Sequence, residues 1–252
     1  MPQHSWVDNG PFLIKRGDVA CLVIHGFAGS PAEVRPFAEA LADKGMTVYA
    51  PVLPGHASTA AALTRHNRHD WLKTAEEAFD WLSESHTHVF VAGLSMGALL
   101  SIRLAQHRRV TGLVLMAPAL IARDQRLKFA GALSFLKDYV PEAFVPRAGL
   151  VDPKAWKRLW HYERRALRAL SQLYKLQLEA RIALPSVHVP TLIFHGLRDL
   201  TVPERAAIEV MKLLGSTHKE LIWLEDSGHC LTADGEVELV SDRVNRFFDQ
   251  LV

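Results

Sequence analysis

The sequence predicts an α/β fold in which a mostly parallel sheet is covered by helices on both faces. Short, apolar, β-rich runs alternate along the chain with longer helical patterns, and this alternation is typical of parallel sheets. The chain has 252 residues, of which 49% are hydrophobic, enough to bury the core of one larger α/β domain. We therefore expect a single domain that spans residues 1–252.

Six segments are predicted as strands, because each is a short run rich in β-branched and apolar residues. They are 18–26, 46–52, 87–93, 110–118, 190–196 and 219–225. The predicted helices are 31–44, 70–85, 96–108, 203–214 and 235–251. The first helix carries a start signal: Ser30 as N-cap, Pro31 at the first helical position and Glu33 nearby.

One long segment breaks this alternation. From about Arg123 to Val189 the sequence shows no convincing strand and only a helical pattern. The segment is too long for an ordinary loop between a helix and a strand. We therefore expect a helical cap, inserted into the domain between about residues 120 and 188.

Composition and charge exclude several classes of protein. Lys and Arg number 29 against 27 Asp and Glu, and a net charge of +2 is too balanced to indicate nucleic acid or an anionic membrane. Two cysteines, Cys21 and Cys230, favour a reducing compartment over a disulfide framework. The N-terminal residues lack a secretory pattern, and no apolar run approaches the about 20 residues of a membrane helix. We expect a cytoplasmic protein without a membrane span; its oligomeric state, monomer or dimer, stays open.

Ser95 lies where a predicted strand becomes a helix. The segment GLSMG at 93–97 matches the pattern G-x-S-x-G, which alone is weak because glycine and serine are common in turns. Here a strand precedes the pattern and a helix follows it, as a nucleophile elbow requires. Neighbouring glycines remove the Cβ atoms that would clash at such a strained turn. The context predicts Ser95 as a nucleophile at a helix N-terminus, where developing negative charge is favoured.

A serine nucleophile needs a base, and the base needs an acid to orient it. His229 follows the last predicted strand, and Asp199 follows the strand before it. The order Ser95, Asp199, His229 is the chain order of this elbow class, and all three follow strands whose carboxyl ends share one edge. Asp124, after the strand 110–118, is the alternative acid, but the GLRD context favours Asp199. Asp226 is interpreted as a loop residue.

Two backbone N–H groups are expected to hold the oxyanion. One belongs to Met96, directly after the nucleophile, and the other to Phe27 in the loop after the first predicted strand. Gly26 and Gly29 would permit the tight path of that loop, and His25 would brace it. His56, His66 and His69 lack the spacing of a metal site, so no metal or other cofactor is expected.

Five motifs occur in the order typical of one family: HGF at 25–27, APVLPGH at 50–56, GLSMG at 93–97, GLRDLTVP at 196–203 and SGH at 227–229. On these motifs the chain resembles the α/β-hydrolase fold family of bacterial carboxylesterases and monoacylglycerol lipases, over roughly residues 18–250. The resemblance implies an α/β-hydrolase domain whose variable cap is the helical insertion. Two positions depart from the family pattern, because Ala98 and Ala57 stand where glycine is common among relatives.

The predicted function is hydrolysis of a small carboxylic ester, of short-to-medium acyl chain or a monoacylglycerol, through an acyl-enzyme on Ser95. Apolar side chains of the oxyanion loop and the cap are expected to bind the acyl chain: Phe27, Phe129, Leu133, Leu136, Trp156 and Leu159. An amidase, a peptidase or a C–C bond hydrolase would use the same triad, and a non-catalytic binding protein on this scaffold is a further alternative. Dehalogenases and epoxide hydrolases are disfavoured, because they need a carboxylate in place of Ser95.

Overall fold

The computed structural model describes residues 8–141, 149–153, 155, 159, 162 and 164–252. Its main sheet has seven strands in the order β1-β3-β2-β4-β5-β8-β9. All neighbouring strands run parallel except β1 (Phe12–Ile14), which pairs antiparallel with β3 at one edge. The mostly parallel sheet predicted from the sequence is therefore confirmed.

All six predicted strands are present, each beginning or ending within a few residues of its predicted bounds. They are β2 (Val19–Ile24), β3 (Thr47–Ala50), β4 (His88–Leu94), β5 (Leu113–Met116), β8 (Thr191–Gly196) and β9 (Lys219–Leu224). The edge strand β1 was not predicted, because three residues are too short to show a periodic pattern.

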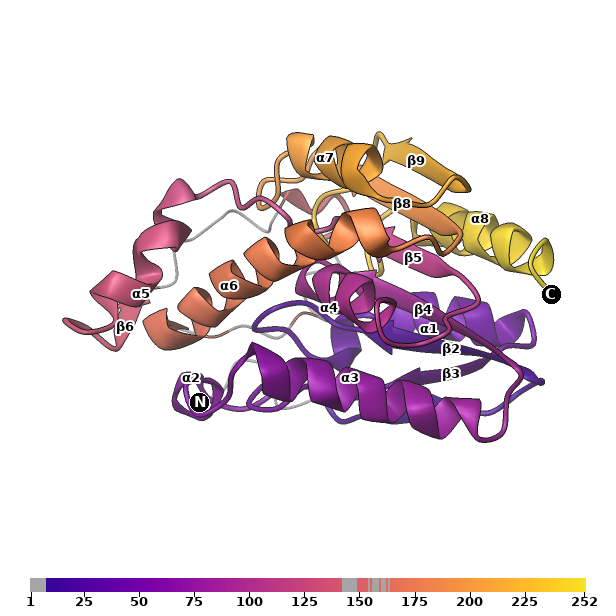
Figure 1. Ribbon diagram of the computed structural model, residues 1–252, viewed down its shortest axis with the longest axis horizontal. Coiled ribbons are helices and arrows are strands. Elements are labelled where there is room, and N and C mark those ends of the chain that lie inside the picture. The colour runs from indigo at the N-terminus through magenta and orange to yellow at the C-terminus, as the bar shows by residue number, and fades with distance from the viewer. Residues whose placement is uncertain (1–7, 142–148, 154, 156–158, 160–161, 163) are drawn as a thin grey trace.

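Helices cover both faces of the sheet (Figure 1). On one face lie α1 (Arg35–Asp43) and α8 (Val237–Asp249), whose apolar residues form one buried cluster with the sheet. On the other face lie α3 (Arg68–Ser83), α4 (Met96–Leu104), α6 (Leu167–Ala183) and α7 (Arg205–Leu213), in a second cluster. The central strand β4 serves both clusters: Val89 and Val91 point to the second, and Phe90 and Ala92 to the first.

The predicted helix 31–44 divides into the 3-10 helix η1 (Pro31–Glu33) and α1. Ser30 precedes it in an extended conformation, but its side chain makes no capping hydrogen bond and its Oγ donates to Asn9 Oδ1 at 2.6 Å. A short helix, α2 (Ala60–Leu63), was not predicted; the Thr59 side chain caps it. None of the helices in the described part of the chain is both long and apolar enough to cross a membrane.

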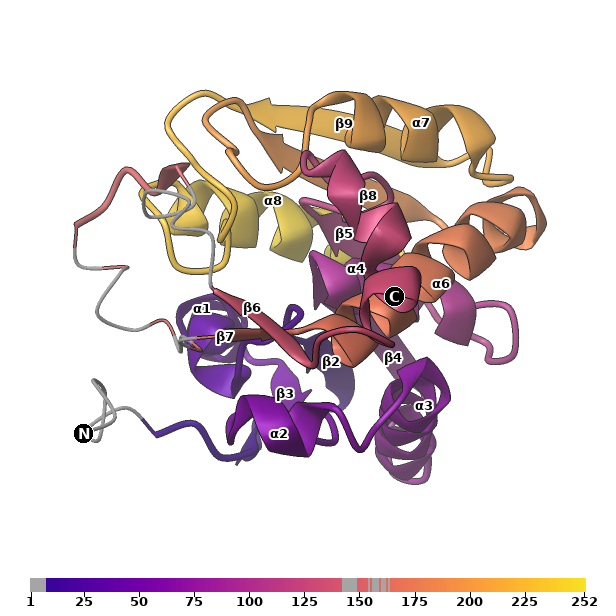
Figure 2. The same cartoon turned by 90° about the vertical axis from the view of Figure 1, so that its left-hand side faces the viewer.

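The elements between β5 and β8 begin across the carboxyl ends of the strands, as Figure 2 shows, and then return along the face of the sheet with α6 (Figure 1). They are η2 (Gln125–Phe129), α5 (Ala130–Leu133), β6 (Tyr139–Pro141), β7 (Arg164–Ala166), α6 and η5 (Leu184–Ser186). The expectation of a segment without strands was wrong, because β6 and β7 pair as an antiparallel two-stranded sheet. Strands of three residues carry no recognisable alternation, and the basic residues of β7 resemble the polar face of a helix.

Candidate active site

Ser95 lies between β4 and α4 with a strained backbone. Its φ is 56° and its ψ is −110°, a combination that residues with a Cβ rarely adopt. The surrounding structure imposes this conformation: the Ser95 N–H donates to Met116 O at 2.8 Å, and Ser95 O accepts from Ala119 N at 3.3 Å. The last residue of β5 and the loop after it therefore hold the backbone N–H and the carbonyl oxygen of Ser95.

The two glycines around Ser95 are required by close packing. A Cβ on Gly93 would lie 2.3 Å from the carbonyl carbon of Gly97, and a Cβ on Gly97 would lie 2.1 Å from Ile24 O at the end of β2. Both distances are far shorter than a van der Waals contact, so only glycine fits at either position. The strand, turn and helix predicted around the GLSMG motif are thus present in the structure.

His229 and Asp199 form a buried hydrogen-bonded pair. His229 Nδ1 lies 2.7 Å from Asp199 Oδ2, and the other oxygen of Asp199 accepts the backbone N–H groups of Thr201 at 2.7 Å and Val202 at 2.8 Å. With Asp199 ionised, Nδ1 carries the proton and donates, which leaves Nε2 of His229 as an acceptor. This is the tautomer that a general base needs.

The pKa values of the pair follow from burial and mutual attraction. Burial lowers the pKa of His229, but the charge and hydrogen bond of Asp199 and the charge of Glu33 outweigh burial, and the pKa lies above its ordinary value. Burial raises the pKa of Asp199, yet the charge of His229 and the hydrogen bonds that Asp199 accepts bring it below the ordinary range. Asp199 is thus ionised at neutral pH.

The loop after β2 lies beside the serine. A Cβ on Gly26 would lie 3.5 Å from the Cβ of Ser95. Within the described residues, neither the Phe27 N–H nor the Met96 N–H has a hydrogen-bond partner. These two N–H groups are thus free to donate to a ligand oxygen, and their role at the oxyanion stays a prediction.

His25 braces this loop from within the core. Its Nε2 accepts the backbone N–H of Leu53 at 3.1 Å, so its Nδ1 carries the proton and donates to Gly26 O at 2.9 Å. Burial lowers the pKa of His25 to about 4, with the bond to Gly26 opposing, so the ring is neutral at neutral pH. The bracing role predicted for His25 is confirmed.

The residues that the sequence analysis rejected as triad or metal-site residues have other contacts in the structure. Asp124 is exposed, caps η2 and pairs with the Arg126 guanidinium at 2.8 Å, so it is not the acid that contacts His229. Asp226 is exposed and pairs with Arg198. His56 is buried, with its ring 5.1 Å from that of His25.

The apolar side chains proposed for acyl binding lie in different environments. Phe27 is half-buried, and its ring packs edge-on against Trp71. On the cap, Phe129 is 55% exposed, Leu133 42% and Leu136 81%, whereas Leu159 is buried in the cluster that contains Cys230 and Leu231. Trp156 lies outside the described residues. The acyl-binding role of this set stays a prediction.

Sequence reasoning missed two buried carboxylates of the site. Glu33, interpreted as a helix-start residue, instead accepts the Gly26 N–H at 2.5 Å. Asp234 accepts backbone N–H groups from Gly228 at 2.7 Å, from Val151 at 3.0 Å and from Asp152 at 2.8 Å. Asp234 thereby fastens the loop of His229 to residues 151–152, which lie between β6 and β7 within the inserted segment. Neither carboxylate shows a motif, and only their burial in the fold reveals them.

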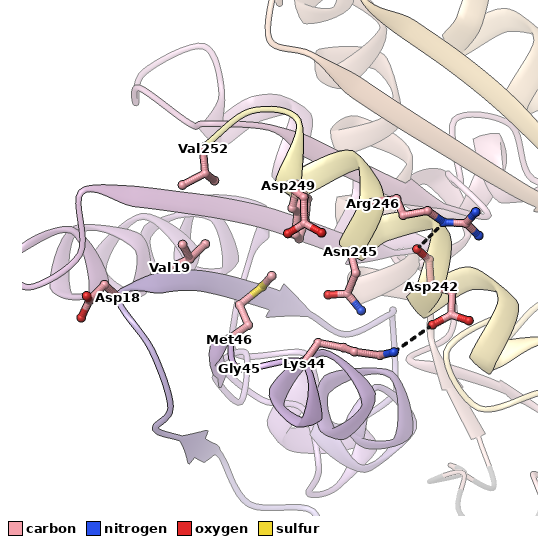
Figure 3. Close-up of a pocket in the computed structure, with 11 residues that line it drawn as sticks. Asp18, Val19, Lys44, Gly45, Met46, Asp242, Asn245, Arg246, Asp249 and Val252 are labelled. Carbon is pink, nitrogen blue, oxygen red and sulfur yellow. Dashed lines mark hydrogen bonds and ion pairs between the residues drawn. The ribbon is translucent and has the colours of Figure 1, made fainter.

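A cavity of about 570 Å³ lies at the opposite edge of the sheet (Figure 3). It is lined by residues near the start of β2, the end of α1 and the last turns of α8, and the Lys44 ammonium pairs there with Asp242 at 3.5 Å. None of the predicted site residues lines it. This cavity therefore gives no support to the predicted site.

Comparisons with known proteins agree with the fold and the motif order. A family model described as "Serine aminopeptidase, S33" (Hydrolase_4) matches residues 16–236. The chain is 33% identical over 241 residues to a thermostable monoacylglycerol lipase of Bacillus sp. (strain H-257), covering 94% of this chain and 93% of that protein. It is 28% identical over 242 residues to a carboxylesterase of Bacillus subtilis (strain 168), covering 96% of each.

Solved structures give the same assignment. A structure described with the metagenome-derived lipolytic enzymes LipS and LipT superposes with a TM-score of 0.89 at 30% identity, covering 96% of this chain and 98% of that one. The monoglyceride lipase of Saccharomyces cerevisiae shares the fold, with a TM-score of 0.82 at 14% identity, covering 96% and 91%. The chain therefore belongs to the Hydrolase_4 family of α/β-hydrolases, and it is a hydrolase enzyme related to carboxylesterases and monoacylglycerol lipases.

Proposed function

We propose that the protein is a serine esterase that cleaves small carboxylic esters, monoacylglycerols among them, through an acyl-enzyme on Ser95. The observation that carries the proposal is the 2.7 Å bond between His229 and Asp199, in a chain that also holds Ser95 at a φ of 56° between a strand and a helix. A purely structural turn has no need of a strained serine, nor of a buried ion-paired histidine after a neighbouring strand.

Each residue has one role in this reaction. Ser95 Oγ attacks the ester carbonyl while His229 Nε2 takes its proton, and Asp199 stabilises the imidazolium that forms. The carbonyl oxygen becomes an oxyanion and accepts the N–H groups of Phe27 and Met96. His229 then gives its proton to the leaving alcohol, which leaves an acyl group on Ser95. Water, deprotonated by His229, releases the acid by the same steps.

The apolar surface of the cap favours an ester with an apolar acyl group over a peptide as the substrate. Phe129, Leu133 and Leu136 expose apolar surface on elements that lie across the strand ends. Each methylene that such surface covers contributes about 0.8 kcal/mol until the chain outgrows the site. The rate constant kcat/KM on p-nitrophenyl esters is therefore expected to rise from acetate and to peak at short-to-medium chains. Triacylglycerols are expected to be poor substrates, because three acyl chains must pass under one cap.

Labelling with a fluorophosphonate probe tests the nucleophile. The wild-type protein is expected to take up one label, and Ser95→Ala to lose both the label and ester turnover, by roughly 10³-fold or more. Ser101→Ala is the matched control, because Ser101 is buried in the helix that follows Ser95 and its Oγ donates to Gly97 O. Ester turnover by Ser95→Ala at the wild-type rate would contradict the proposal.

A substrate panel tests the reaction class. It compares p-nitrophenyl esters from C2 to C16, monoacylglycerols and aminoacyl p-nitroanilides, at a fixed detergent concentration. Aminoacyl substrates are included because the matching family model is described as a serine aminopeptidase. Faster turnover of aminoacyl substrates than of plain esters would replace the esterase assignment with a peptidase, even with Ser95 confirmed.

A further inference from the structure

Glu33 is a buried carboxylate directly beneath the loop that carries Phe27. It is 7% exposed, and its Oε1 accepts the Gly26 N–H at 2.5 Å. The proposed triad does not use it. A buried carboxylate is costly to keep unless it has a partner and a purpose, so its place beside the reacting groups needs an explanation.

Glu33 and His25 together fix the two peptide planes that flank Gly26. The carboxylate holds the N–H of Gly26, and Nδ1–H of His25 holds its carbonyl oxygen. The peptide unit that contains Gly26 O also contains the N–H of Phe27, pointing the opposite way because the unit is planar and trans. Both dihedral angles of an otherwise flexible glycine are thereby set, and with them the direction of the Phe27 N–H.

The glycines of this loop make room for the carboxylate. A Cβ on Gly29 would lie 2.4 Å from Glu33 Oε2, and one on Gly26 would lie 3.0 Å from Oε1. Neither glycine has a φ in the left-handed region, so the backbone conformation alone does not demand glycine there. The tight turn predicted here is present, because Gly29 N donates to Gly26 O at 3.3 Å, and the carboxylate of Glu33 in addition occupies the space that a side chain at either position would need.

Glu33 also contacts the loop that carries the base. Its backbone carbonyl accepts the Thr232 hydroxyl at 2.6 Å, and Phe37 N donates to Thr232 O at 3.2 Å. The carboxylate is close enough to act electrostatically on both His229 and Cys230. The residue therefore joins the oxyanion loop to the base loop.

Few of the groups around Glu33 change charge near neutral pH. Burial holds the pKa of the Cys230 thiol well above its ordinary value, and His25 is neutral because its pKa is about 4. Burial raises the pKa of Glu33 itself to about 7, while the bond from Gly26 and the charge of His229 oppose that rise. Asp199 contacts His229 Nδ1 and stays ionised. Glu33 is thus a neighbour of His229 whose own charge changes in the neutral range.

We propose that Glu33 is a positioning residue that aims the oxyanion loop through Gly26 and supplies a second negative charge to His229. The inference rests on the proposed esterase function. It assigns two separable roles to one side chain. The first is a hydrogen bond to Gly26, which glutamine can also make, and the second is a negative charge near His229, which glutamine lacks.

Three substitutions separate these two roles. Glu33→Gln keeps an acceptor for Gly26 without the charge, Glu33→Asp keeps the charge but withdraws it by one methylene, and Glu33→Ala removes both. Glu39→Gln is the control, because Glu39 is an exposed acid on the neighbouring helix α1. The readouts are kcat and the pH profile of kcat/KM on one p-nitrophenyl ester, after circular dichroism has established folding.

Glu33→Gln is expected to retain kcat within about threefold while the acid limb of its pH profile moves to lower pH, because His229 loses a stabilising anion. Glu33→Asp and Glu33→Ala are expected to lose roughly tenfold or more in kcat, since losing one oxyanion donor costs about 10²–10³. If the pH profile of Glu33→Gln superposes on that of the wild type, the charge of Glu33 does not act on His229. If folded Glu33→Asp keeps the full kcat, the hydrogen bond to Gly26 does not position the oxyanion loop.

Fluorophosphonate labelling keeps this test distinct from that of the proposed function. If wild-type protein neither labels nor hydrolyses any ester, the esterase function fails. If wild-type protein labels and Glu33→Gln, Glu33→Asp and Glu39→Gln all label with the wild-type rate and pH dependence, the esterase function stands and the assignment of Glu33 fails. If Glu33→Ala fails to fold, both conclusions can still be reached, because Glu33→Gln and Glu33→Asp test the role of Glu33 and the wild-type protein tests the esterase function.

Discussion

The sheet edge that carries Ser95 and the cap are built by different kinds of constraint. Around Ser95, backbone packs on backbone so closely that a single Cβ at Gly97 would meet Ile24 O at 2.1 Å. On the cap, large apolar side chains face solvent, and Phe135 is 91% exposed. The edge is thus fixed by local steric exclusion, whereas the cap leaves apolar surface available for contact with a substrate. The comparison leads us to expect that, in the proposed esterase, reaction geometry and substrate choice depend on separate parts of the chain.

The largest effect is expected at the acid of the edge. Asp199→Asn should lower kcat by about 10⁴-fold, because an amide favours the wrong tautomer of His229. Asp124→Asn should leave kcat near the wild-type value, since Asp124 is exposed and pairs with Arg126 at the start of the cap. Steady-state kinetics on one ester compare the two variants, and the opposite ranking would contradict the assignment of the acid.

A pair of glycine substitutions sharpens the steric part of the comparison. Gly97→Ala is expected to destabilise the protein by about 3 kcal/mol or more, because backbone must move to admit the new methyl group. Gly131→Ala, in the cap helix α5, is expected to change stability by less than about 1 kcal/mol, since its Cβ would meet only Ser171 Cβ at 3.7 Å. Urea unfolding measures the free energy of unfolding of both variants. Equal losses of stability would show that the packing around Gly97 is no tighter than that in the cap.

The pH dependence of stability provides a third contrast. Burial raises the pKa of Glu33 from 4.5 to about 7, so between these values the folded state keeps a proton that the unfolded state releases. The free energy of unfolding therefore falls as pH rises through this window. Glu33→Gln lacks this contribution, because glutamine does not titrate. Relative to wild type, Glu33→Gln should gain on the order of 1–3 kcal/mol between pH 4.5 and pH 8. Urea unfolding measures the difference in the free energy of unfolding between Glu33→Gln and wild type. A difference that stays constant from pH 4.5 to pH 8 would contradict the raised pKa of Glu33.

The smallest effect on stability is expected on the cap. Leu136→Ser should change the free energy of unfolding by less than about 0.5 kcal/mol, because Leu136 is 81% exposed. Its effect should appear in selectivity instead: kcat/KM for octanoate should fall relative to acetate, by about fourfold for each methylene that loses contact. An unchanged chain-length profile would exclude Leu136 from the acyl-binding surface.

The turn around Ser95 could be predicted from the sequence because its requirements are local. The G-x-S-x-G spacing, the strand before it and the helix after it are all contiguous, and the order of Ser95, Asp199 and His229 follows from the order of the strands. Glu33 and Asp234 could not be predicted in this way. Their roles arise from contacts with distant loops, and a lone carboxylate near a helix start or in a loop carries no pattern that distinguishes burial from exposure.

The cap was predicted in outline and misjudged in detail for a related reason. Its length showed that an insertion is present, but β6 and β7 are separated by more than twenty residues and have three residues each. Pairing at that separation is decided by tertiary contacts and not by local propensity. The long helix of the cap, α6, begins at Leu167, directly after β7.

The bonds of Asp234 limit how freely the cap can be exchanged between relatives. Its carboxylate holds backbone N–H groups of Val151 and Asp152 with one oxygen and that of Gly228 with the other. A graft that replaced residues 120–188 as a block would remove two of these donors and leave a buried anion short of partners, at a cost of about 1–3 kcal/mol for each lost bond. A transplanted cap must therefore bring two backbone amides of its own to Asp234, or the recipient must keep residues 149–153.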